Sequence, residues 1–135
     1  MSVVINKAPG QKILELGGGG NRNPASDVNL DCRHVPGVDI VGSLEEPLLI
    51  TTEEFDCVLC IYAIEHVSYR RIPDLLKECL RVTKPGGKAA FLTSNTLAQF
   101  EWIKNNPEGW DGKDFFTSAS CIIFGDGDYA DNCHK

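Results

Sequence analysis

Residues 13–21 read Ile-Leu-Glu-Leu-Gly-Gly-Gly-Gly-Asn, an apolar run that ends in four consecutive glycines. A short apolar run of this kind predicts a buried strand. A strand that ends in glycines lets backbone N–H groups approach a ligand where a Cβ atom would collide. Glycine-rich turns are common, so the stretch gains meaning only together with the residues that come after it along the chain.

The rest of the chain alternates between apolar strand patterns and helical patterns. Further strands are predicted at 28–31, 38–41, 57–61, 88–93 and 119–124, and helices at 70–82 and 97–105. Pro73 fits the first turn of the helix at 70–82, and Pro85-Gly86-Gly87 is expected to end it. Strands alternating with helices predict a parallel α/β sheet whose ligand lies at the carboxyl ends of the strands.

Three later features come after the glycines in a recognisable order. Asp31 closes a short strand, Phe-Asp-Cys-Val-Leu-Cys at 55–60 precedes Glu65-His66, and Lys84-Pro-Gly-Gly87 precedes an apolar run. Together they resemble the class I S-adenosylmethionine-dependent methyltransferases over about residues 12–95. The resemblance implies a Rossmann-like, mostly parallel sheet flanked by helices, with S-adenosyl-L-methionine as cofactor. Full-length members carry a further helix and a strand pair, and we expect this chain to lack part of them.

The resemblance assigns the nucleoside to the glycines and Asp31. Gly17 and Gly19 are expected to form the turn, and the Asp31 carboxylate to accept both ribose hydroxyls, although a turn-forming Asp is the alternative. Glu15 is expected to bind the cofactor's ammonium group or, equally, to bond N–H groups of its own loop. Asp31 follows Gly17 by 14 residues. This gap is too short for the helix that binds a pyrophosphate, which argues against a dinucleotide.

The remaining cofactor residues are also assigned by the resemblance. Ser43 and Leu44 are expected near the adenine, although Ser43 is equally suited to capping a turn. Asn21 tolerates a left-handed backbone, so it can replace a third glycine of the turn. The other residues expected to line the cofactor site are Gly18, Cys32, Cys60, Ile61 and Tyr62.

His66 is the candidate catalytic residue, either as a base for an acceptor hydroxyl or as a residue that lines the methyl-donor site. The alternative is a histidine that orders the start of the next helix. Cys57 and Cys60 have the spacing of a metal or redox pair, but residues three apart on a strand point to opposite faces. We therefore expect no metal site and reduced cysteines.

Length, net charge and composition bear on the number of domains, on the kind of partner and on the location of the protein. The chain has 135 residues, which favours a single domain over 1–135, and its net charge of −6 disfavours a nucleic-acid partner. No membrane span or signal peptide is recognisable, so we expect a cytoplasmic protein.

The function expected from the sequence is methyl transfer from S-adenosylmethionine to a small-molecule acceptor. A cofactor-binding module without turnover is the alternative, and a nicotinamide-dependent oxidoreductase is a third reading that the short glycine–Asp31 gap disfavours. Because a parallel sheet needs cover on both faces, we also expect a homodimer built partly from residues 97–124.

Overall fold

The computed structural model describes residues 3–105 of the chain. The chain divides into two compact units, residues 1–92 and 93–135. A single domain over 1–135 stays a prediction. The strand expected at 119–124, and the part of the expected dimer surface beyond residue 105, lie outside the described residues.

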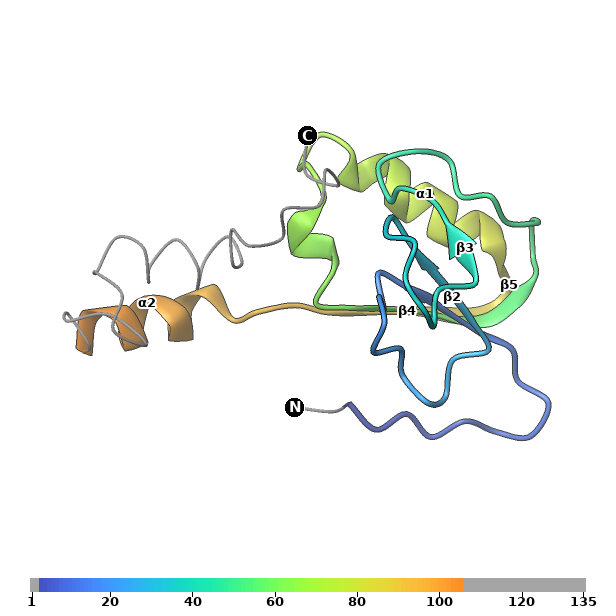
Figure 1. Cartoon of the computed structure of the whole chain (residues 1–135), viewed down its shortest axis with the longest axis horizontal. Helices are drawn as coiled ribbons and strands as arrows, with labels where there is room; N and C mark the ends of the chain where they lie inside the picture. Colours follow the sequence, from blue (N-terminus) through green and yellow to red (C-terminus); the bar gives the residue numbers. More distant parts are fainter. Residues whose placement is uncertain (1–2, 106–135) are drawn as a thin grey trace. The chain divides into compact units, whose positions relative to one another are not determined.

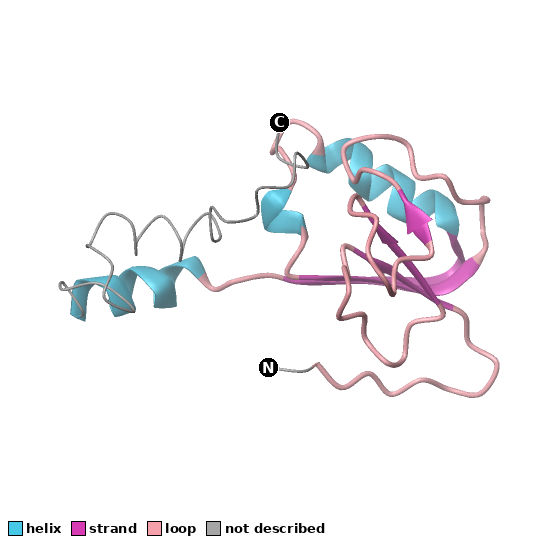
Figure 2. Ribbon diagram, viewed as in Figure 1, coloured by secondary structure: helices cyan, strands magenta, loops and turns pink. Residues whose placement is uncertain are grey.

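The first unit is built on a five-stranded parallel sheet (Figures 1 and 2). Its strands are β1 Ile13–Leu16, β2 Val28–Asp31, β3 Ile40–Val41, β4 Phe55–Ile61 and β5 Thr83–Leu92. The strand order is β3-β2-β1-β4-β5. From β1 the chain moves outward through β2 and β3 and then returns to the other side of β1. This reversal places a topological switch point at the carboxyl ends of β1 and β4, where ligands of such sheets bind.

The fold class is confirmed, and of the five strands predicted within residues 3–105, four are confirmed with small shifts in their bounds. β5 begins earlier than predicted, at Thr83, directly after the helix. Its pairing with β4 is interrupted between Phe55 and Cys57, and Lys84-Pro85-Gly86-Gly87 forms the irregular part of the strand. The turn residues therefore mark a bulge within β5 and not a loop in front of it.

One α-helix, α1 Ile72–Val82, packs on the sheet, and the short 3₁₀ helix η1 Ile64–His66 precedes it. Pro73 lies in the first turn as predicted, and Leu75, Cys79 and Val82 are buried at helical spacing. These three side chains join the core, which also contains the following residues of β1, β2 and β4: Leu14, Leu16, Leu30, Phe55, Val58 and Cys60.

The other face of the sheet is covered differently. Ile13 and Leu59 are buried on it, and Figure 1 shows the segments before β1 and between β1 and β2 on that side. No helix separates β1 from β2, so the short gap between Gly17 and Asp31 holds only turns, as predicted. In the second unit, α2 Thr96–Asn105 confirms the helix expected at 97–105.

Candidate cofactor site

The glycine turn begins where β1 ends, at the switch point. Gly17 has a φ of 75° and Gly19 a φ of 53°, a left-handed backbone that side chains disfavour. The Gly17 N–H donates to the Leu30 carbonyl at 2.8 Å, which fixes the turn to the end of β2. A Cβ atom on Gly17 would overlap the Ala63 side chain, which follows β4. The turn is therefore held tightly between the carboxyl ends of β2 and β4.

Asp31 lies directly beside this turn. The Gly19 N–H donates to Asp31 Oδ2 at 2.9 Å. Its other oxygen, Oδ1, accepts from the Arg33 backbone N–H at 2.9 Å and from Arg33 Nε at 3.1 Å. Asp31 is only 4% exposed, so it is more enclosed than a free strand-end carboxylate would be. The structure thus brings together the two features on which the nucleoside assignment depends.

Glu15 is buried beneath the turn. Its Oε2 accepts from the Asn23 backbone N–H at 2.6 Å and from the Ser26 hydroxyl at 2.9 Å. This is the loop-binding arrangement that the sequence left open as an alternative. Oε1 faces the turn, 2.9 Å from the position that a Cβ atom on Gly18 would take. Glu15 therefore orders the loop with one oxygen and has the other directed at the glycines.

Three further predicted residues lie near the turn or in the loop after β3. Asn21 does not adopt a left-handed backbone, since Glu53 and Tyr62 are the described non-glycine residues with positive φ. It closes the turn instead, because its N–H donates to the Gly18 carbonyl at 3.2 Å. Ser43 Oγ accepts from the Glu45 N–H at 3.1 Å, which is the turn-capping alternative. Leu44 packs against the core and lies close to Gly17.

The residues at the end of β4 are divided between the core and the surface. Cys60 is fully buried in the core, so only its backbone can face a ligand at this edge of the sheet. Tyr62 is 43% exposed and has a φ of 50°. A strained backbone of this kind is found preferentially at functional sites.

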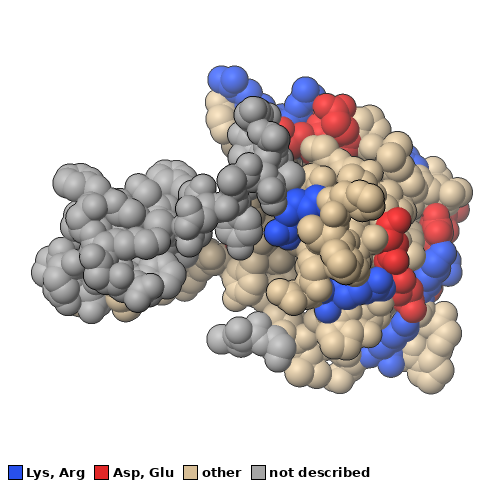
Figure 3. All heavy atoms as spheres, viewed as in Figure 1, with Lys and Arg blue, Asp and Glu red and all other residues tan. Residues whose placement is uncertain are grey.

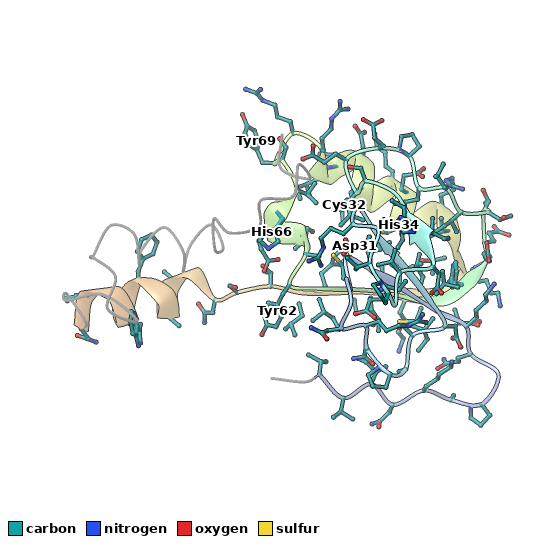
Figure 4. The ribbon with its side chains drawn as sticks, viewed as in Figure 1. Asp31, Cys32, His34, Tyr62, His66 and Tyr69 are labelled. Atoms are coloured by element: carbon teal, nitrogen blue, oxygen red, sulfur yellow. The ribbon has the colours of Figure 1, made fainter. Side chains whose placement is uncertain are left out.

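His66 ends η1, and its N–H donates to the Ala63 carbonyl at 3.0 Å. Figure 4 shows His66 on the side of β4 that carries α1 and Tyr62 on the other side. The structure therefore does not pair these two predicted site residues with each other. Cys32, which follows Asp31, is exposed.

The other three described cysteines, Cys57, Cys60 and Cys79, are free thiols. Burial raises the pKa of Cys60 to about 12 and that of Cys79 to about 11, and it also raises the pKa of Cys57. Within residues 3–105, no group of three or more His, Cys, Asp or Glu side chains is arranged to hold a metal.

We predict that Cys60 and Cys79 of the native protein stay unmodified by a thiol reagent at pH 8, because the thiolate is the reactive form. In denaturant both should react within minutes. Mass spectrometry of the peptides after labelling measures this. Labelling of Cys60 in the folded protein at the rate of an exposed thiol would contradict its place in the core.

Two residues that bear on the site, Asn29 and Arg33, are not among those predicted from the sequence. Asn29, in the middle of β2, is fully buried and bonds the glycine turn with its side chain. Arg33 occupies one oxygen of Asp31. A polar residue at a buried position of an otherwise apolar strand was the available signal for Asn29, whereas the position of Arg33 depends on a turn that the sequence does not specify.

Comparison with known proteins identifies the family of this chain. Residues 21–91 match the family described as "Methyltransferase domain", which is more than half of the chain. The chain belongs to this methyltransferase family, and the family implies S-adenosyl-L-methionine as cofactor.

Two curated proteins are similar in sequence. "Probable phthiotriol/phenolphthiotriol dimycocerosates methyltransferase 2" of Mycobacterium ulcerans is 35% identical, over 69% of this chain and 43% of its own length. "Demethylmenaquinone methyltransferase" of Renibacterium salmoninarum is 29% identical, over 62% of this chain and 41% of its own length. The chain thus spans less than half the length of the curated relatives it matches.

Solved structures share the fold. A SAM-dependent methyltransferase from Thermotoga maritima superposes with a TM-score of 0.59 at 24% identity, over 76% of this chain and 54% of that one. A protein from Pyrococcus horikoshii gives a TM-score of 0.56 at 23% identity, over 70% of this chain and 50% of that one. At these identities the likeness shows the fold alone.

Proposed function

We propose that this chain binds S-adenosylmethionine at the glycine turn and transfers its methyl group to a small-molecule acceptor. The observation that carries the proposal is the 2.9 Å contact between the Gly19 N–H and the Asp31 carboxylate at the switch point of a parallel sheet. This arrangement suits a nucleoside, because a carboxylate accepts hydrogen bonds from two hydroxyl groups well. It suits a pyrophosphate poorly, because no helix begins after the glycines.

The Asp31 carboxylate can accept a further hydrogen bond, which supports a nucleoside at this position. Binding of both ribose hydroxyls also requires a change at Arg33. Oδ2 accepts one hydrogen bond, from Gly19, and has a lone pair to spare, whereas Oδ1 already accepts two from Arg33. A ribose that bonds both oxygens must therefore displace the Arg33 guanidinium from Oδ1. The remaining proposed cofactor contacts are predicted residues of β1, of the glycine turn and of the segments that follow β2 and β3: Glu15, Gly17, Gly18, Asn21, Cys32, Ser43 and Leu44.

When bound, the cofactor supplies an electrophilic methyl group. The task of the chain is then to hold an acceptor in line with that group, which by itself lowers the barrier greatly. We propose that the end of β4 and the segment after it do this. Ile61 and Tyr62 would lie beside the donor, and His66 would be the base for an acceptor that must lose a proton. Tyr62 carries a strained backbone at this edge of the sheet, which supports a role for it there.

The acceptor class is inferred from the relatives. The curated relatives are named for demethylmenaquinone and for phthiotriol or phenolphthiotriol dimycocerosates, which are not macromolecules. On the face shown in Figure 3, Lys and Arg side chains alternate with Asp and Glu side chains, which does not favour a nucleic acid. No helix in the described part of the chain has the length and apolar content that a bilayer crossing requires.

Turnover on a panel of small acceptors, followed as formation of S-adenosylhomocysteine, tests the proposal. The His66→Ala variant should lose activity on hydroxyl acceptors and keep its affinity for S-adenosylhomocysteine. Binding of S-adenosylhomocysteine without turnover on any acceptor class would favour the alternative of a cofactor-binding module.

We also propose that two copies associate. Large apolar side chains are exposed in each unit, among them Leu80 at 73% in α1 and Phe100 at 53% in α2. Burying such groups at a symmetric contact stabilises a dimer. Light scattering at micromolar concentration should give twice the chain mass of 14.8 kDa, and a monomer mass would contradict the dimer.

A further inference from the structure

Asn29 is the fully buried polar side chain of β2, and its hydrogen bonds all lead to the loops around the site. Its Oδ1 accepts from the Gly18 N–H at 3.2 Å. Its Nδ2 donates to the Gly19 carbonyl at 2.8 Å and to the Gly37 carbonyl at 2.8 Å. One side chain thus ties the glycine turn to the turn that precedes β3.

These contacts use the full donor capacity of the amide. A side-chain amide has two N–H donors, and in Asn29 each is directed at a different loop. The backbone of Asn29 is held as firmly, since its N–H donates to Asp39 Oδ2 at 2.8 Å and its carbonyl accepts from the Asp39 N–H at 2.9 Å. The backbone of Asn29 therefore holds its side-chain amide in place, and this side-chain amide holds the glycine turn.

The position of the turn determines where its N–H groups point. The Gly19 N–H donates to Asp31, and the Gly19 carbonyl accepts a hydrogen bond from the Asn29 side chain. Gly18, whose N–H is bonded to Asn29, also lies close to the Glu15 carboxylate, because a Cβ atom at this position would overlap it. A shift of the turn would move the Gly19 N–H away from Asp31 and the turn away from Glu15 together. Apolar side chains of similar size offer no substitute for the amide.

We propose that Asn29 is a positioning residue for the cofactor site. It acts through the glycine turn, keeping the Gly19 N–H and the Asp31 carboxylate in the arrangement that accepts the nucleoside. The proposal rests on the proposed function, because it assumes that the nucleoside binds at this turn.

The test compares the same substitution at two buried asparagines. In Asn29→Thr, the threonine suits a strand, but its side chain cannot reach both the glycine turn and the turn before β3. Asn23→Thr is the matched control, because the Asn23 side chain also bonds two backbone groups, the Val3 carbonyl and the Ala25 N–H, but neither belongs to the glycine turn. In titration calorimetry with S-adenosylhomocysteine, the stoichiometry reports the folded fraction, and Kd reports the shape of the site.

We expect Asn29→Thr to raise Kd about tenfold and Asn23→Thr to change it less than about twofold, although both variants lose stability. A folded Asn29→Thr protein with the wild-type Kd would overturn the proposal and leave Asn29 a purely structural residue. A wild-type protein that does not bind the ligand would instead contradict the proposed function, and this is seen before any variant is made.

A measurement on the wild-type protein covers the case in which Asn29→Thr does not fold. The side-chain amide signals of Asn29 in a ¹⁵N spectrum should shift when S-adenosylhomocysteine is added, and those of Asn23 should shift less. An Asn29 signal unaffected by saturating ligand would overturn the proposal.

Discussion

An Asp31→Ala variant is expected to bind S-adenosylhomocysteine about a hundredfold more weakly than the wild-type protein. Hydrogen bonds to a charged group contribute about 1.5–3 kcal/mol each, and about 1.4 kcal/mol corresponds to a factor of ten in Kd. The variant loses the ribose acceptors and also releases the Gly19 N–H, which the carboxylate holds at 2.9 Å. Titration calorimetry with the folded variant measures the effect.

Asp56→Ala is the matched control for this prediction. The Asp56 carboxylate also accepts a backbone N–H, from Lys12 at 2.7 Å, and lies beside a cation, Lys84 Nζ, at 3.3 Å. It lies at the amino end of β4, on the edge of the sheet opposite the glycine turn. Asp56→Ala should leave Kd unchanged within about twofold, whereas equal losses in both variants would assign the effect to general destabilisation.

Asp31→Asn separates charge from shape. The amide is similar in size and keeps a neutral oxygen acceptor, so we expect a loss of about tenfold, between those of the wild-type protein and the alanine variant. An Asp31→Ala variant that is folded and binds with wild-type affinity would show that the ribose is held elsewhere.

The second large effect is expected at Gly17. Gly17→Ala should lower the free energy of unfolding by about 3–5 kcal/mol, because the alanine must adopt a left-handed backbone and its Cβ atom overlaps the Ala63 side chain. Urea denaturation followed by circular dichroism measures the change. The variant should also lose cofactor affinity, since the turn can no longer lie between the ends of β2 and β4.

The chain offers a close control in Gly10. Its φ of 79° matches the 75° of Gly17, but no atom lies within 4 Å of the position of its Cβ. Gly10→Ala should therefore cost only the backbone strain, about 1–2 kcal/mol. The double variant Gly17→Ala/Ala63→Gly removes the overlap, and recovery of part of the lost stability relative to additive effects would identify that overlap as the cause. Equal losses at Gly10 and Gly17 would contradict the close packing of the turn.

Much of the fold could be predicted from the sequence because its signals are local. The glycine run, the period of Leu75 and Cys79, and the position of Pro73 each determine structure within a few residues. β5 was the exception. Its pairing with β4 extends to Thr83 through a bulge, and the turn signals of Pro85-Gly86-Gly87 are the same for a bulge and for a loop.

The site was predictable to a smaller extent. Asp31 and Gly19 lie together because adjacent parallel strands end at the same edge of the sheet, which the sequence indicates. The burial of the Cys60 side chain depends on which face of β4 meets α1, and a near-continuous apolar run does not encode that choice. The role of Asn29 depends on contacts with two loops that are separated in sequence, which no local pattern specifies. The position of Arg33 depends on the conformation of the turn after β2, which the sequence does not specify either.

We propose that the glycine turn and Asp31 form a nucleoside site of the S-adenosylmethionine type. Thermal unfolding of the wild-type protein, with S-adenosylhomocysteine and separately with NAD, tests this assignment. Ligand at a hundred times its Kd stabilises the folded state by about 2.7 kcal/mol, so S-adenosylhomocysteine should raise Tm by several degrees and NAD should leave it unchanged. An unchanged Tm with millimolar S-adenosylhomocysteine, or a rise with NAD alone, would contradict the account.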